Sequence, residues 1–290
     1  DVTSVGIMHK GVRLDFVREG ERWLVAEKGD YPAAGDKVRR IALALADMTL
    51  IEPKTQEPKL YPRLDVEDPG RGQSALVTVK DRSGATLAAL IVGKRRYDRL
   101  GQGIDGVYVR RPGHRQSWLA AGSLDLDGDA ANWLQRAVLD IPAERIAKVT
   151  LTQPDGKTLV IDRAKPNGKF AVEGAPAGTK FANDTTISEP AIALASLTLD
   201  DVAPAAQNPI PETGVVRARY QTFDGLEIDL RLVERGKTPW VAITATGSGK
   251  EATAAKTIAH RTAPWIYAIP NYKADLLKTT LGRLVLPAKS

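Results

Sequence analysis

The sequence contains no cysteine. This absence excludes disulfides, iron–sulfur clusters, thiolate zinc sites and cysteine nucleophiles. It leaves the compartment open, because an oxidising space permits disulfides without requiring them. Long apolar runs are missing as well. The best run, residues 85–92, has the length of a strand, whereas a membrane-spanning helix needs about 18 apolar residues or more.

Histidine is scarce, and its spacing argues against a metal site. His9, His114 and His260 lie far apart in the sequence, with none of the short intervals that metal-binding histidines show. The sequence also lacks the G-x-S-x-G, H-E-x-x-H and S-x-x-K motifs of hydrolases. We therefore expect no metal and no cofactor. A hydrolase whose site is assembled from distant residues remains the least favoured alternative.

The composition that is present is that of an ordinary soluble globular protein. The chain has 290 residues, of which 43% are hydrophobic and 26% charged, and this length predicts two domains. Forty-one lysines and arginines against 35 aspartates and glutamates give a net charge of +6, a mild basic bias that favours anionic surfaces. Because the chain begins at Asp1 without a signal peptide, we expect that a targeting segment or membrane anchor preceded it.

The two halves of the sequence repeat one order of patterns. Each half offers three strand-like segments, a helical stretch, a hairpin and one or more further strands. The corresponding segments are 5–8, 11–16, 23–25, 45–50, 77–92, 107–109 and 118–119 in the first half, and 149–152, 156–161, 170–172, 194–199, 219–233 and 240–243 in the second. We predict an α+β fold of two tandem modules, residues 1–142 and 143–290, each an antiparallel sheet backed by a helix.

The strand predictions depend on alternation and on turn residues. Apolar and polar side chains alternate over 12–17 and, more cleanly, over 228–232, which is typical of half-buried strands. Asp155-Gly156 and Asp224-Gly225 supply the positive φ that tight hairpin turns need. The sequence therefore predicts two hairpins in the second module.

A helix of the first module is predicted from an apolar stripe, with Asp36 as its N-cap. The stripe consists of Val38, Ile41, Leu45 and Met48. In the second module Pro190 interrupts the counterpart, so either Ser188 caps a late start or the helix is kinked.

Further elements are expected between and after the modules. We predict a linking helix over 129–139 that buries Trp133, Leu134 and Val138. A C-terminal closing segment is predicted to consist of a helix over 250–261, a strand over 265–269 and a short helix over 272–279.

Taken together, these patterns resemble the bacterial family called domain of unknown function 4340. No one of them is diagnostic, but their order and spacing are specific as a set. They are Trp23 with Leu24, Tyr31-Pro-Ala-Ala, the helix to Leu50, Glu52-Pro-Lys, Leu60-Tyr61, Leu64, Val66-Glu-Asp-Pro69, Ile91-Val-Gly-Lys94, Tyr108-Val-Arg-Arg-Pro112, Trp118-Leu119, Asn132-Trp133-Leu134, Leu139-Asp-Ile-Pro142 and Trp265-Ile-Tyr-Ala-Ile-Pro270.

The resemblance implies a location and a set of partners, but no catalytic residues. It implies one N-terminal membrane helix with the remainder outside the cytoplasm, in the periplasm. For some members it implies a link to auxiliary components of ABC transporters of the gliding-motility type. We therefore expect envelope or transporter proteins as partners.

Two ligand motifs lack part of what their function requires. Residues 101–106 match the dinucleotide pattern G-x-G-x-x-G, but a strand-like segment follows where a helix is required, so we expect no nucleotide. Asp125, Asp127 and Asp129 have the spacing of a calcium loop without its glycine and final glutamate. Asp127 or Asp129 is more simply an N-cap for the helix of Trp133.

One basic cluster remains as a candidate site. It consists of Lys94, Arg95, Arg96, Arg99, Arg110, Arg111, His114 and Arg115. If 85–92 and 107–111 form a hairpin, both of its ends converge on one rim, where an anionic lipid headgroup, an acidic polymer or an acidic protein could bind. The alternative is a solvated loop that shields a sheet edge. We expect no nucleic acid, because no nucleic-acid-binding module is recognisable.

We consider two functions, of which the favoured one is implied by the family resemblance together with the lack of an assembled catalytic motif. The favoured one is a non-enzymatic accessory or scaffold protein exposed in the cell envelope. The second is a module that binds an anionic ligand through the basic cluster.

Overall fold

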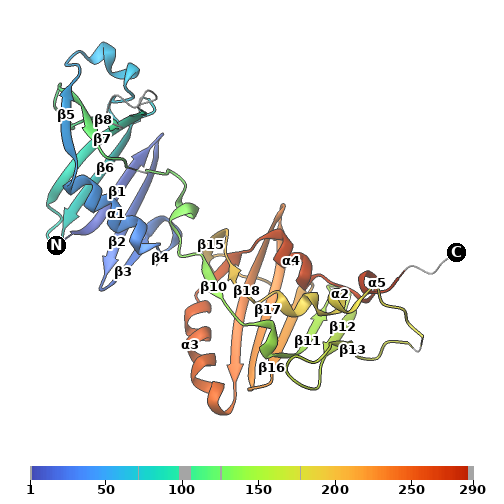
Figure 1. Cartoon of the computed structure of the whole chain (residues 1–290). Coiled ribbons are helices and arrows are strands. Elements are labelled where there is room, and N and C mark those ends of the chain that lie inside the picture. The colour runs from blue at the N-terminus through green and yellow to red at the C-terminus, as the bar shows by residue number, and fades with distance from the viewer. Residues whose placement is uncertain (1, 71, 98–105, 125, 177, 287–290) are drawn as a thin grey trace. The chain divides into compact units, whose positions relative to one another are not determined.

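The computed structural model describes residues 2–70, 72–97, 106–124, 126–176 and 178–286. The chain divides into two compact units, Asp1–Gln135 and Arg136–Ser290, each built on an antiparallel sheet with a few helices (Figure 1). A mixed α+β fold is therefore confirmed. The sequence places the division after residue 142. In the structure, 136–142 goes with the second unit, because β10 (Ala137–Leu139) pairs with β14 (Leu197–Thr198).

The described residues of the first unit form a nine-stranded sheet in the order β4-β3-β2-β1-β6-β7-β8-β9-β5. The strands are β1 (Val2–His9), β2 (Val12–Glu19), β3 (Arg22–Val25), β4 (Tyr31–Pro32), β5 (Thr49–Pro53), β6 (Ala75–Asp81), β7 (Thr86–Arg96), β8 (Gly106–Arg110) and β9 (Ser117–Ala121). The strand that alternation predicts over 12–17 is confirmed as β2.

Helix α1 (Gly35–Ala46) packs against β1 and β3 and covers part of one sheet face. Val38 and Ile41 are buried there, which confirms the predicted helix. The predicted N-cap is wrong. Because Gly35 already begins the helix, Asp36 lies inside the first turn, where its carboxylate accepts a hydrogen bond from Arg39.

The other sheet face of the first unit is covered by the connection between β5 and β6. A 3₁₀ helix, η2 (Pro58–Arg63), carries Tyr61, which packs with Val66 against Ile91 of β7. The connection passes very close to Gly93, since a Cβ there would lie 2.2 Å from the carbonyl oxygen of Leu64. Glycine at 93 therefore permits the connection to lie directly on the strand.

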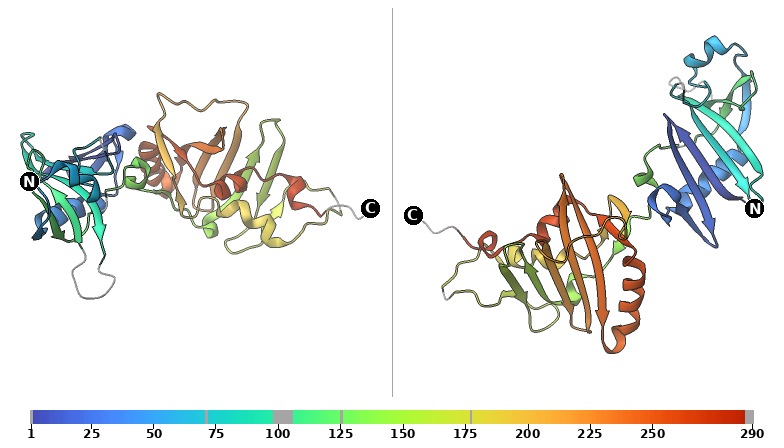
Figure 2. Two further views of the ribbon diagram at one scale, coloured as in Figure 1. Left: turned by 90° about the horizontal axis from the view of Figure 1, so that it is seen from above. Right: turned by 180° about the vertical axis from the view of Figure 1, so that it is seen from behind.

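The described residues of the second unit form an eight-stranded sheet in the order β13-β12-β11-β16-β17-β18-β19-β15. Its strands are β11 (Ile146–Thr152), β12 (Thr158–Asp162), β13 (Ala171–Val172), β15 (Asp201–Pro204), β16 (Val216–Thr222), β17 (Leu226–Arg235), β18 (Thr238–Gly247) and β19 (Trp265–Ala268). Its helices are α2 (Asp184–Ser188), α3 (Ala252–Thr262), α4 (Asn271–Leu277) and α5 (Leu281–Leu284), and Figure 2 shows α2 and α4 on the same side of the sheet.

The predicted C-terminal elements are confirmed as α3, β19 and α4, but they do not form a closing segment. Strand β19 lies inside the sheet, between β18 and β15. Helix α3 is an insertion between two neighbouring strands, and α4 packs against β16 and β18. The sequence matched Trp118-Leu119 with the region of Trp240. In the structure Trp118 and Leu119 lie in β9, whose place in the strand order is taken by β19 in the second unit, whereas Trp240 lies in β18.

Two predicted helices are wrong in whole or in part. Over 129–139 the chain forms only a 3₁₀ turn, η3 (Ala130–Trp133), before β10, because β10 finds a hydrogen-bonding partner in β14. In the second unit, α2 begins after Asn183, whose side chain accepts a hydrogen bond from the Thr186 amide at 2.8 Å. Ser188 is the last residue of α2 and also the N-cap residue of η5 (Glu189–Ile192), without a capping side-chain hydrogen bond, and Pro190 lies in the first turn of η5, as one of the two alternatives predicted.

The two sheets share one strand order. Without β4, the first sheet reads β3-β2-β1-β6-β7-β8-β9-β5, and the second follows the same path through its own strands in the same chain order. In both units the strand that follows the helical stretch pairs at the far edge, with the last strand to enter the sheet. The connection that follows that edge strand covers one sheet face in each unit.

The registers correspond as well. In the first unit Val5 of β1 faces Phe16 of β2 and Val79 of β6. In the second, Val149 of β11 faces Ile161 of β12 and Tyr220 of β16, and all six of these side chains are buried. A register shift directly precedes each valine, between Val2 and Ser4 and between Ile146 and Lys148.

Proline occurs at three sheet edges. Edge strand β4 contains Pro32, β5 ends at Pro53 and β15 ends at Pro204. A proline has no amide hydrogen, so each of these edges offers fewer donors to an added strand.

The close approach at Gly93 gives a stability test. We expect Gly93→Ala to lower the free energy of unfolding by about 3 kcal/mol, because the new methyl group must displace the backbone of 64–65. Gly35→Ala is the matched control, since its Cβ meets only side-chain atoms, none nearer than 3.4 Å. Thermal and urea unfolding followed by circular dichroism measures both variants, and an unchanged midpoint for Gly93→Ala would contradict the close approach.

Candidate functional site

The structure separates the predicted basic cluster into two groups. Arg96 faces Gly106 at the beginning of β8, whereas Ile91 faces Arg110 at its end. Lys94–Arg96 therefore lie at one end of β8 and residues 111–115 follow the other, about 13 Å away at the usual rise per residue. The predicted convergence on one rim is wrong, because the chain enters β8 beside the arginines of β7 and leaves it at the opposite end.

Arg110 is buried and holds a loop in place. Its side chain is 4% exposed. Nε donates to the carbonyl oxygen of Val66 at 2.8 Å, and Nη1 donates to that of His114 at 3.0 Å. Nη2 donates to Asp68 at 2.6 Å, and the guanidinium lies 4.5 Å from the ring centroid of Tyr61. All three of its nitrogens are engaged within the chain, so Arg110 is a structural residue of this loop.

The other residues of the cluster differ in their surroundings. Lys94, Arg95, Arg96, Arg111, His114 and Arg115 are exposed, and Arg99 lies outside the described residues. Arg95 donates to the carbonyl oxygen of Leu124 at 3.5 Å. Arg96 adds a small contribution to a lowered pKa of Glu52, of which the hydrogen bond from Lys54 is the main cause. Within the described chain, Arg111 and His114 have no side-chain hydrogen bond or ion pair.

Arg111 and His114 stand at the rim of a groove that the sequence did not reveal. The groove encloses about 700 Å³ beside the C-terminal end of α1. It is lined mainly by apolar side chains from α1, the segment after it, and strands β5, β7, β8 and β9, namely Leu45, Met48, Leu50, Leu87, Ala88, Ala89, Leu90, Val109 and Trp118. Its polar lining residues are Arg110, Arg111, His114 and Gln116, with no carboxylate among the described residues that line it.

The groove is partly apolar because it includes an incompletely covered part of a core face. Alternation places Leu90 and Trp118 on the same sheet face as α1, but α1 makes its main contacts with β1 and β3. Leu87 is consequently 53% exposed and Leu50 43% exposed. The apolar run 85–92 could be recognised in the sequence. The sequence did not show that part of this run is left uncovered by α1.

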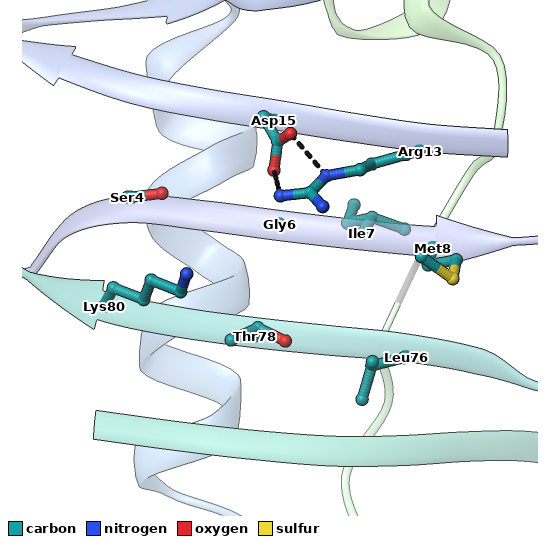
Figure 3. A pocket seen from close by; sticks show the side chains of 9 residues that line it. All are labelled: Ser4, Gly6, Ile7, Met8, Arg13, Asp15, Leu76, Thr78 and Lys80. Atoms are coloured by element: carbon teal, nitrogen blue, oxygen red, sulfur yellow. Dashed lines mark hydrogen bonds and ion pairs between the residues drawn. The ribbon is translucent and has the colours of Figure 1, made fainter. Parts of the chain in front are cut away.

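A second hollow lies on the opposite, polar face of the same sheet (Figure 3). It encloses about 200 Å³, and Figure 3 shows Ser4 and Met8 of β1 beside Thr78 and Lys80 of β6. Arg13 and Asp15, both on β2, form an ion pair at one side of it at 2.6 Å. Because Arg13 pairs with the carboxylate of Asp15, the polar groups that this hollow offers are the hydroxyls of Ser4 and Thr78 and the ammonium group of Lys80. The hollow is therefore a polar contact surface.

The acidic triplet serves as a cap. Asp129 accepts a hydrogen bond from the Ala131 amide at 3.0 Å and caps η3, as predicted. Asp127 accepts from the side chain of Asn132 at 2.7 Å, while Asp125 lies outside the described residues. In the part of the chain that the structure describes, no three histidine, cysteine or acidic residues are grouped to hold a metal ion. The nucleotide-like motif falls outside the described residues except for Gly106.

Comparison with known proteins now decides the family. The family model described as domain of unknown function (DUF4340) matches residues 23–215, about two thirds of the chain. The chain belongs to this family. No curated protein and no solved structure matches it. The match of the DUF4340 model includes both groups of basic residues and the groove, and ends just before β16. Among the described residues, no helix is long and apolar enough to cross a membrane.

The contrast between two adjacent arginines gives the second test. We expect Arg110→Met to lower the free energy of unfolding by about 3 kcal/mol, because the buried carbonyl oxygen of Val66 and the part-buried carbonyl oxygen of His114 lose their donor. Arg111→Met, at an exposed position, should change it by no more than about 0.5 kcal/mol. Urea unfolding of the two variants checks this, and equal midpoints would contradict a structural role for Arg110.

Proposed function

We propose that the protein is a non-enzymatic accessory or scaffold protein that acts outside the cytoplasm. In this proposal a membrane helix anchors the full-length protein, and its partners belong to an envelope system of the ABC-transporter type. Membership of the DUF4340 family supports this assignment, since the resemblance implies those properties. The residues that line the two hollows of the first unit supply contact surface and charge.

We further propose that the chain is a tandem duplication of one α+β module. The single observation that carries the scaffold proposal is the shared strand order, reinforced by the corresponding bulges before Val5 and Val149. Pairing partners, register and bulge position are each free to vary between unrelated sheets. Duplication of a module suits a protein that holds partners together.

A second candidate function is the binding of an anionic ligand, and one observation favours it. Arg111 and His114 are exposed, carry no partner within the described chain, and stand beside an apolar groove. An anionic lipid headgroup or an acidic protein segment would find both charge and apolar contact there. The proposal uses Arg111, His114 and Arg115, since Arg110 is engaged in the fold.

The scaffold proposal is tested in the organism that makes the protein. We expect in-cell cross-linking of the full-length protein, followed by purification and mass spectrometry, to recover subunits of an ABC transporter or other envelope proteins. A control bait of similar size and charge, sent to the same compartment, should recover none of them. If only cytoplasmic proteins are cross-linked, the scaffold proposal is wrong.

A further inference from the structure

The two units cover corresponding sheet faces differently. In the first unit Leu90 faces Val77, and in the second Leu230 faces Ala218, at the corresponding place in the strand order. Leu230 is 1% exposed, whereas Leu90 is only half-buried and lines the groove. The same core face is therefore closed in one unit and open in the other.

Helix α3, together with α4, closes this face in the second unit. Helix α3 packs against β17 and β18, and its Ala255 is buried. In its last turn, the hydroxyl of Thr262 donates to the carbonyl oxygen of Ile243 at 3.1 Å. The corresponding connection of the first unit, between β8 and β9, is a short loop over 111–116 with no helix. The groove of the first unit thus lies where the second unit places a helix.

The register also indicates which charge an occupant would meet. Leu230 pairs with Ile243, and continuing the register of β7 and β8 by one residue beyond the Ile91–Arg110 pair would set Arg111 opposite Leu90. Arg111 therefore takes the place of Ile243, the residue that the last turn of α3 contacts. A helix seated in the groove as α3 is seated in its own unit would bring its last turn to Arg111 and His114.

We propose that the groove of the first unit binds an amphipathic helix of a partner protein with acidic residues in its last turn. The apolar side chains of the groove would bury the small and aliphatic face of that helix. Arg111 and His114 would pair with its acidic residues. A second copy of this chain does not supply such a helix through α3, because the last turn of α3 carries His260 and Arg261.

This inference rests on the proposed partner-binding function, and it is tested with a defined probe. The probe is a fluorescein-labelled, capped peptide of residues 249–263 with H260E and R261E. It keeps the buried stripe of α3 and reverses the charge of its last turn. We expect it to bind the intact chain in fluorescence anisotropy, and the parent peptide to bind at least about tenfold more weakly, with a difference that shrinks at high salt.

Two groove variants and two controls locate the binding. Leu87→Glu and Arg111→Glu change exposed positions at the groove, so both variants should fold. Each substitution should lower the affinity for the probe at least about tenfold. Val12→Glu and Arg63→Glu change an exposed apolar and an exposed basic residue away from it, and should leave affinity unchanged. Circular dichroism confirms that each variant is folded.

The remaining outcomes overturn the inference. Absence of probe binding, or binding that Leu87→Glu and Arg111→Glu leave unchanged, shows that the groove does not take such a helix. Binding of dodecanoate that depends on Leu87 and Arg111, without probe binding, assigns the groove to an acyl chain instead. Cross-linking in the cell is independent of these peptides, so failure of the helix proposal and failure of the scaffold proposal are distinguishable.

Discussion

The need to cover one apolar face of a broad antiparallel sheet governs both units. Alternation along each strand makes one face apolar, and that face is stable in water only when other elements bury it. In the second unit η5, α3 and α4 share this task, so that Ile228, Leu230 and Ile243 are almost fully buried. In the first unit α1 reaches only part of the sheet, and the remainder becomes the groove. The groove is thus a consequence of the fold rather than a separate construction.

Elements whose signals are local could be predicted from the sequence. Strong alternation identified β2 and β17, and the apolar stripe identified α1. The linking helix failed because Trp133, Leu134 and Val138 suit a helix as well as a buried turn followed by a strand. Only the pairing of β10 with β14, which are distant in sequence, decides between these, and such pairing leaves no local signal.

The candidate site was harder to predict, because it depends on register and on long-range packing. Arg95 and Arg96 are close in sequence to Arg110, yet the pairing of β7 with β8 places them at opposite ends of β8. Arg110 and Arg111 are neighbours with opposite surroundings, since one points toward the 54–72 connection and the other toward the groove. Charge density along a sequence therefore did not distinguish a buried structural arginine from one that is free to meet a ligand.

The prolines at the sheet edges influence how this protein can meet others. Pro32, Pro53 and Pro204 each remove an amide hydrogen from a strand at a sheet margin. Continuation of either sheet by a foreign strand, the route that leads to open-ended polymers, is correspondingly disfavoured at those margins. Of the four edge strands that the described residues give to the two broad sheets, β4, β5 and β15 thus offer fewer donors to a foreign strand, whereas β13 contains no proline.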